Sequence, residues 1–176
     1  KVGLGSNLTL DGTINPDFGQ VEADPAEVNL TAFETFFPEK RPFFIEGNQL
    51  LQGSGPGYYY SRRIGATPQG YATGEVADSA DFLESPRYAT ILGAAKLTGR
   101  TSSGMSIGAL AAVTQREYAN LYDTGTDSFE LVAVEPSTAY LVGRVQQEFG
   151  ASASTVGVTL TGLSRNFSDA EPLRQQ

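Results

Sequence analysis

The amino-acid sequence predicts a mainly β protein, in which an antiparallel meander forms part of a transmembrane β-barrel and a short-helix, Phe- and Pro-rich insertion occupies residues 16–87. Three observations predict this fold. Apolar and polar residues alternate over strands of about ten residues, one strand face is apolar throughout, and short connections alternate with long ones. Soluble β-sandwiches also alternate, but their strands are usually about five or six residues long. The combination therefore favours an outer-membrane barrel over a soluble sandwich.

The strands are predicted from their period of two residues. The first covers residues 8–15, where Leu8 and Leu10 share one face and Thr9 and Asp11 share the other. Two hairpins follow, one over residues 88–114 with its turn at 99–104, and one over residues 139–161 with its turn at 150–154. Their polar side chains are expected to face the lumen, namely Lys96, Arg144, Gln146 and Glu148. Residues 66–86 and 115–137 are predicted to be loops.

The insertion begins with a turn, because Pro16 keeps the residue before it out of the helical region. Asp24 and Glu27 have the spacing of a capping pair around Pro25, which predicts a helix over residues 25–37, ended by Pro38. Its many apolar residues require a cover. Residues 58–65 belong to the insertion too, because a further wall strand there would spoil the up-and-down strand order.

Charged residues surround the aromatic run 42–45 and recur shortly after it. The candidate cluster consists of Glu39, Lys40, Arg41, Glu46, Arg62 and Arg63. The two later arginines are expected either to pair with Glu39 or Glu46 or to be a solvated pair. The cluster would then line a luminal constriction or hold the insertion in place, and the sequence leaves both interpretations open.

Composition excludes several classes of function. The 176 residues carry a net charge of −8 and include neither Cys nor His. The negative charge argues against a nucleic-acid partner. The missing residues remove thiolate and imidazole metal sites and His-dependent catalysis, so we expect no metal and no cofactor. The longest apolar runs are too short for a membrane-spanning helix, and both chain ends read as interrupted structure, so we expect a fragment of a longer protein.

Three stretches in order carry a resemblance to a known family: residues 15–25 (NPDFGQVEADP), 36–44 (FFPEKRPFF) and 60–65 (YSRRIG). The chain resembles a family of outer-membrane β-barrel proteins of unknown function from Gram-negative bacteria. Members place a family-nine carbohydrate-binding-like module before the barrel. The resemblance implies that residues 1–176 are a partial barrel domain of the bacterial cell outer membrane. Its partners would be outer-membrane lipid, and the missing strands and N-terminal module of its own full-length chain.

The leading functional hypothesis is an outer-membrane barrel with a binding or transport role, in carbohydrate uptake or processing, whose insertion forms a luminal constriction. Carbohydrate is therefore a candidate partner, although no residue present inherits sugar binding from the absent module. Charged side chains at such a constriction would set which solutes pass.

Two alternatives belong to other classes of function. A carbohydrate-active hydrolase component would need two carboxylates about 5–9 Å apart, and the candidate pairs are Glu22 with Asp24 or Glu39 with Glu46. We expect no enzymatic activity, because the sequence has no His and no recognisable nucleophile motif. The other alternative is a structural scaffold of a cell-surface complex, with residues 115–137 as the contact.

Overall fold

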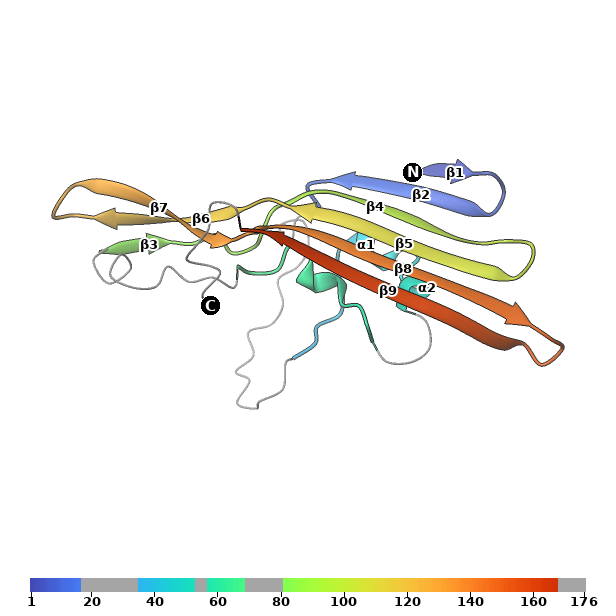
Figure 1. Ribbon diagram of the computed structural model, residues 1–176. Helices are drawn as coiled ribbons and strands as arrows, with labels where there is room; N and C mark the ends of the chain where they lie inside the picture. Colours follow the sequence, from blue (N-terminus) through green and yellow to red (C-terminus); the bar gives the residue numbers. More distant parts are fainter. Residues whose placement is uncertain (17–34, 53–56, 69–80, 168–176) are drawn as a thin grey trace.

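A six-stranded antiparallel sheet dominates the computed structural model, which describes residues 1–16, 35–52, 57–68 and 81–167. Figure 1 shows the strands side by side in the order β1-β2-β4-β5-β8-β9. Their bounds are β1 Val2–Leu4, β2 Leu8–Ile14, β4 Ile91–Arg100, β5 Met105–Thr114, β8 Ser137–Phe149 and β9 Ser154–Asn166. The prediction of a mainly β, antiparallel fold is confirmed, and β4, β5, β8 and β9 have 10, 10, 13 and 13 residues.

The register of the sheet assigns each strand residue to one of two faces. One row across the sheet consists of Asp11, Lys96, Leu110, Val142 and Thr161. This row, with every second residue from it along each strand, forms what we call the covered face. A bulge between Ile91 and Gly93 shifts the alternation at the start of β4, so Ile91 also packs on this face. The residues between them form the apolar face. The predicted alternation in β2 is confirmed, since Leu8 and Leu10 lie on the apolar face.

Part of the insertion packs on the covered face. We call the described residues 35–52 and 57–68 the covering segment; it contains α1 Pro42–Ile45, α2 Gln49–Gln52 and the 3-10 helix η2 Ser61–Arg63 (Figure 1). Phe44, Leu51 and Ile64 of this segment are each only 1% exposed. They join sheet residues in one hydrophobic core, the sheet members being Ile91, Ala94, Leu110, Ala112 and Val142. As predicted, residues 58–65 supply no strand to the sheet.

The helix predicted over residues 25–37 is not where the described helices lie. Residues 17–34, including Asp24 and Glu27, lie outside the described residues, while residues 35–37 are not helical. The first described helix, α1, begins only at Pro42. A proline forces its predecessor into extended backbone, and Arg41 has φ −74° and ψ 119°. Proline itself suits a first helical position, so a new helix, α1, begins at Pro42.

The loops predicted over residues 66–86 and 115–137 are wrong in part. They contain β3 Phe82–Glu84, β6 Glu117–Asp123 and β7 Ser128–Glu135, which form a second, three-stranded sheet. Aromatic side chains hold it together, since the Tyr122 ring centroid lies 4.6 Å from that of Phe129 and 6.3 Å from that of Phe82. Cross-strand aromatic pairs of this kind stabilise short strands that carry little alternation of their own.

The connections of the main sheet alternate as predicted. β1–β2, β4–β5 and β8–β9 are joined by short turns, whereas β5 and β8 are joined through the β6–β7 hairpin, which extends from the opposite end of the sheet (Figure 1). β2 and β4 pair directly, with Ile14 opposite Gly93, although the whole insertion separates them in sequence. Among the described residues, no helix is long and apolar enough to cross a membrane.

Helix α2 lies so close to the sheet that it requires a glycine beneath it. A Cβ atom at Gly108 would lie 2.6 Å from the carbonyl oxygen of Leu50. We therefore expect Gly108→Val to push α2 off the sheet, at a cost of about 1–3 kcal/mol. Hydrogen exchange should show faster exchange of the amides of residues 43–52.

Gly143 provides the matched control for this substitution. It lies on the apolar face of the neighbouring strand β8, and a Cβ atom there would have no atom within 4 Å. Gly143→Val should leave exchange of residues 43–52 unchanged. Equal exchange in both variants would contradict the close packing of α2 on β5.

Candidate functional site

A buried ion pair forms the centre of the covering segment. The Arg41 and Glu39 side chains are 2% and 8% exposed, and two hydrogen bonds of 2.8 Å join the guanidinium to the two carboxylate oxygens. Arg41 also donates to the carbonyl oxygens of Ile64 and Ser61, at 2.7 and 2.9 Å, and the Ser61 hydroxyl donates to Glu39 at 2.6 Å. The pair therefore ties the chain before α1 to η2.

The same contacts determine how Glu39 titrates. Burial acts to raise the pKa of its carboxyl group, but the hydrogen bonds from Arg41 and Ser61 outweigh burial and hold the pKa below its usual value. The guanidinium carbon of Arg41 lies 4.1 Å from the centre of the Phe44 ring, a cation–π contact that fixes the group further. Glu39 and Arg41 thus act as a structural clasp within the covering segment.

Lys96 attaches the covering segment to the sheet. Its side chain is 1% exposed, and its ammonium group donates to the backbone carbonyls of Phe43 and Glu46, at the C-terminal end of α1. A cation at this end compensates carbonyls that the short helix leaves without partners. The Nζ atom also lies 4.7 Å from the centre of the Phe43 ring. Lys96 therefore lies on the side of the sheet that the insertion covers.

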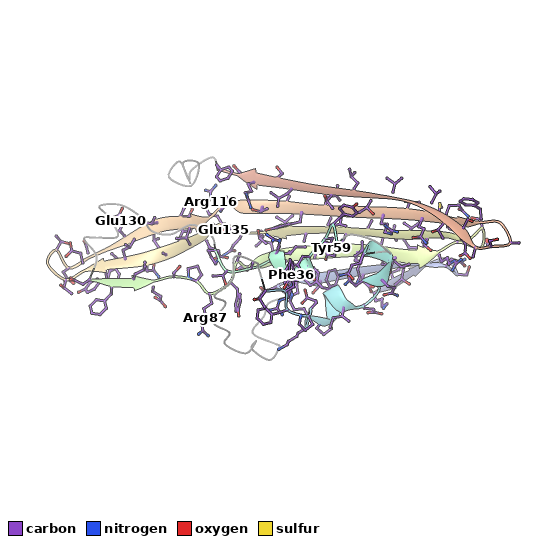
Figure 2. The ribbon with its side chains drawn as sticks, turned by 90° about the horizontal axis from the view of Figure 1, so that it is seen from below. Phe36, Tyr59, Arg87, Arg116, Glu130 and Glu135 are labelled. Carbon is purple, nitrogen blue, oxygen red and sulfur yellow. The ribbon has the colours of Figure 1, made fainter. Side chains whose placement is uncertain are left out.

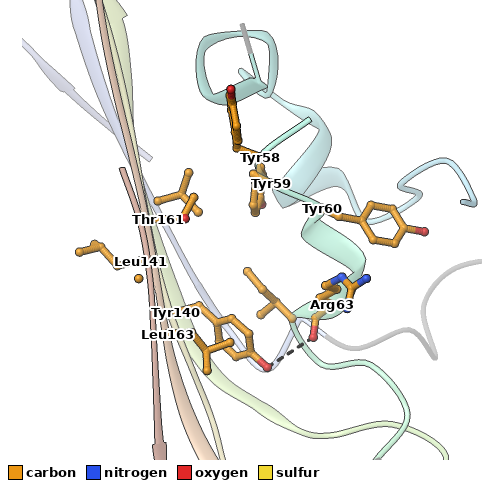
Figure 3. A pocket seen from close by; sticks show the side chains of 11 residues that line it. Tyr58, Tyr59, Tyr60, Arg63, Tyr140, Leu141, Thr161 and Leu163 are labelled. Carbon is orange, nitrogen blue, oxygen red and sulfur yellow. Dashed lines mark hydrogen bonds between the residues drawn. The ribbon is translucent and has the colours of Figure 1, made fainter. Parts of the chain in front are cut away.

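The remaining members of the predicted charge cluster have contacts of other kinds. Glu46 is exposed and pairs with Lys1, while the Lys40 amide donates to Glu39 at 3.1 Å. Arg62 donates to the carbonyl oxygen of Pro38 at 2.9 Å. The carbonyl of Arg63 accepts a hydrogen bond from Tyr140 at 3.4 Å (Figure 3). Glu39 and Glu46 therefore have Arg41 and Lys1 as ionic partners, where the sequence pointed to the two later arginines.

The polar strand residues share the covered face, as their spacing requires. Arg144 donates to Thr159 at 2.9 Å and to Gln146 at 2.7 Å. Glu148, two residues further along the same face, pairs with Arg100 near the short turns. All four predicted strand residues, including Lys96, therefore lie on one side of the sheet.

An aromatic hollow lies between the covering segment and strands β8 and β9. Figure 3 shows Tyr58 and Tyr59 opposite Thr161, with Tyr140 and Leu163 beside them. No pattern in the sequence predicts this set. The only local signal was the run of three tyrosines over residues 58–60, and the long-range contact to β8 and β9 depends on the fold.

Tyr59 is the least solvated hydroxyl of this hollow. Its oxygen is buried close to Ser61 and Glu39, and no hydrogen bond of normal geometry reaches it from the described residues. Burial raises the pKa of Tyr59 well above its ordinary value, and the nearby Glu39 carboxylate adds to the effect. The group is therefore a neutral hydrogen-bond donor throughout the physiological range. Figure 2 shows Tyr59 and Phe36 on the side of the sheet where the helices lie.

Comparison with known proteins gives the family of the chain but no activity. The family described as Domain of unknown function (DUF5916) matches residues 1–171. The chain belongs to this family. Neither the curated proteins nor the solved structures include a match to it.

Removal of one partner from the clasp should weaken the covering segment. Arg41→Gln leaves the buried Glu39 carboxylate without its cation, which typically costs about 3–5 kcal/mol. We expect faster hydrogen exchange over residues 57–68, while the amides of β5 and β8 keep their protection. Arg62→Gln is the control, since Arg62 is more exposed and its hydrogen bond to Pro38 is peripheral. If Arg62→Gln accelerates exchange as much as Arg41→Gln, the clasp does not hold η2.

Acid should release the same contact. The pKa of Glu39 is lowered in the folded protein, so its contribution to stability is complete above its usual pKa of about 4.5 and is lost as pH falls below that value. Protection of residues 57–68, corrected for intrinsic exchange rates, should therefore decrease below about pH 4.5. Glu39→Gln should already have low protection at neutral pH and should lack this step. A step of equal size in the variant would assign it to another group.

Proposed function

We propose that the six-stranded sheet is part of the wall of a β-barrel in the bacterial outer membrane, with a binding or transport role and with the covering segment inside the lumen. The observation that carries the proposal is the exposed apolar face. Among the described residues, its side chains include Ile14 at 86%, Val158 at 70% and Leu160 at 65% exposed.

The apolar face has the composition that lipid requires. In the middle rows from β2 to β9 it presents aliphatic side chains, Ala and Gly, and uncharged polar residues such as Gln147 and Ser164 occur only towards the strand ends. No charged residue lies in its paired rows, while the covered face of the same strands holds Asp11, Lys96 and Arg144. A charge on a lipid-facing strand position costs about 2–4 kcal/mol at the membrane midplane. A patch of this kind on a soluble protein would be an aggregation site. Lipid as the partner of this face satisfies both constraints.

Further strands are part of the proposal, because the sheet has six and the smallest membrane barrels have about eight. The edge strand β9 supports such pairing. It has 13 residues, and its first charge, Arg165, comes at the end, whereas free edges are usually protected by charges or prolines. The proposed partners are therefore outer-membrane lipid and additional wall strands. The carbohydrate-binding-like module of the proteins that the chain resembles suggests a carbohydrate as the solute.

In this proposal the charged residues of the insertion do not form a ring that selects solutes. Glu39 and Arg41 bind each other, and Arg41 also donates to the backbone at the end of η2. These contacts support the interpretation that the two residues hold the covering segment in place. The constriction would instead come from the bulk of the covering segment over β4, β5 and β8. No observation favours a hydrolase, since Glu39 and Glu46 each have their own cation and Glu22 and Asp24 lie outside the described residues.

A second candidate function, contact within a cell-surface complex, is favoured by the β3–β6–β7 sheet. Its exposed apolar side chains include Phe129 at 77% and Phe82 at 66%. They lie on the long connections, at the sheet end opposite the short turns, where the extracellular part of a barrel would be. Figure 2 shows Glu130 on this extension, well away from the covering segment.

Single tryptophans test the orientation of the wall without background, because the sequence has no Trp. Val145 and Gln146 are neighbours on β8 and lie on the apolar and the covered face. In vesicles of brominated phosphatidylcholine, which quench tryptophan on contact, we expect strong quenching for Val145→Trp and weak quenching for Gln146→Trp. The experiment uses the full-length protein that carries this chain.

Both variants occupy almost the same height along β8, so a difference between them reports the face and not the depth. Equal quenching of the two variants, or no quenching in either, would contradict the proposal that the apolar face contacts lipid. An unaltered far-ultraviolet β spectrum serves as the control for folding of both variants.

A further inference from the structure

We propose that the covered face binds small organic anions with an apolar body, in a groove between the covering segment and strands β8 and β9. The anionic group would lie at Arg144 and Gln146, and the apolar body would lie against the tyrosines of the aromatic hollow. The proposal goes beyond the proposed function, since this ligand is not a carbohydrate, and it rests on that function only for the route of entry, because the lumen would bring the ligand to the groove.

The groove consists of two adjoining hollows. The aromatic hollow has a volume of about 340 Å³, and the second, polar hollow has about 430 Å³. They share Tyr58 and Thr161, so one ligand can contact both. Each volume falls within the range of about 300–1,000 Å³ that is usual for small-molecule sites.

The charge of the groove is the opposite of that of the chain. The chain has 20 acidic and 12 basic residues, yet among the described residues the polar hollow is lined by Arg144 and neither hollow is lined by a carboxylate. The hydrogen-bond partners of Arg144 are the neutral side chains of Thr159 and Gln146. The next carboxylate along this face of β8, Glu148, is paired with Arg100. Arg144 thus presents a positive charge that no described side chain neutralises.

The position of Arg144 is fixed by the strand beside it. Gly157 lies on β9 opposite Gln146, and a Cβ atom there would be 3.2 Å from the Nη2 atom of Arg144. The missing side chain lets the guanidinium lie close to the strand, while Thr155, Thr159 and Thr161 add hydroxyl groups along the polar hollow. A planar guanidinium with adjacent hydroxyl and amide donors is suited to a carboxylate or phosphate group.

The aromatic half of the groove explains why an inorganic anion alone is not the best ligand. Tyr58, Tyr59 and Tyr140 line it together with Ile64 and Leu163 (Figure 3). The rings offer apolar contact area at low cost in side-chain entropy. Tyr59 contributes its ring to this half of the groove, since its hydroxyl is buried beside Ser61 and the Glu39–Arg41 pair.

Phenyl phosphate is a suitable probe, because it joins an anionic group to a small ring. We expect saturable binding in isothermal titration calorimetry of the full-length protein in neutral detergent, with at least about tenfold weaker binding of benzyl alcohol, which lacks the charge. Arg144→Gln should weaken phenyl phosphate binding about tenfold or more, and Arg144→Lys should restore part of the affinity. Tyr58→Ala, at a side chain that is 65% exposed, should weaken binding without affecting folding.

Arg87→Gln is the control, because Arg87 is exposed and lines neither hollow. Its affinity for phenyl phosphate should stay within about twofold of the parent protein. Equal affinity of Arg144→Gln and Arg87→Gln, equal binding of benzyl alcohol or maltose, or no saturable binding up to about 10 mM would overturn the proposal. Calorimetry in detergent is independent of the quenching experiment in vesicles, so the groove and the lipid-facing wall can fail separately.

Discussion

The strict division of the sheet into two faces is the constraint on which the rest of the structure depends. A strand offers its side chains alternately to either side, so a residue that serves one face is lost to the other. Here the protein itself covers only one side, through Phe44, Leu51 and Ile64. The other side repeats the same apolar pattern from β2 to β9 and receives no cover from the described residues. The surroundings of the protein must therefore cover this apolar face.

Polar contacts add to the hydrophobic packing of the covering segment. The short helices α1 and α2 have four residues each, too few to be stable by backbone hydrogen bonds alone. Arg41 and Glu39 tie the segment to itself, and Lys96 ties it to the sheet. Buried charges of this kind add specificity more than net stability, because desolvation offsets much of their attraction. They select one arrangement of a segment whose aromatic residues could pack in many ways.

The sequence predicted the parts of this fold that depend on local pattern. The long strands, their faces and the short turns all followed from period-two alternation, and Arg144 and Gln146 fell on the expected side. The β6–β7 hairpin was not predicted, because its strands depend on contacts such as that of Tyr122 with Phe129. The partners of Glu39 and the aromatic hollow were not predicted for a related reason. They depend on how the insertion lies on the sheet, which no periodicity encodes.

The direct pairing of β2 with β4 has a consequence for how the chain folds. Hairpins such as β4–β5 close loops of a few residues, whereas the alignment of Ile14 with Gly93 must close a loop that holds the whole insertion. Loop-closure entropy makes that step about 2 kcal/mol less favourable than a tight turn. The first two strands should thus join the sheet late in folding, after the later hairpins have formed. The insertion therefore delays this step, because β2 can pair with β4 only after the insertion that separates them in sequence has packed on the sheet.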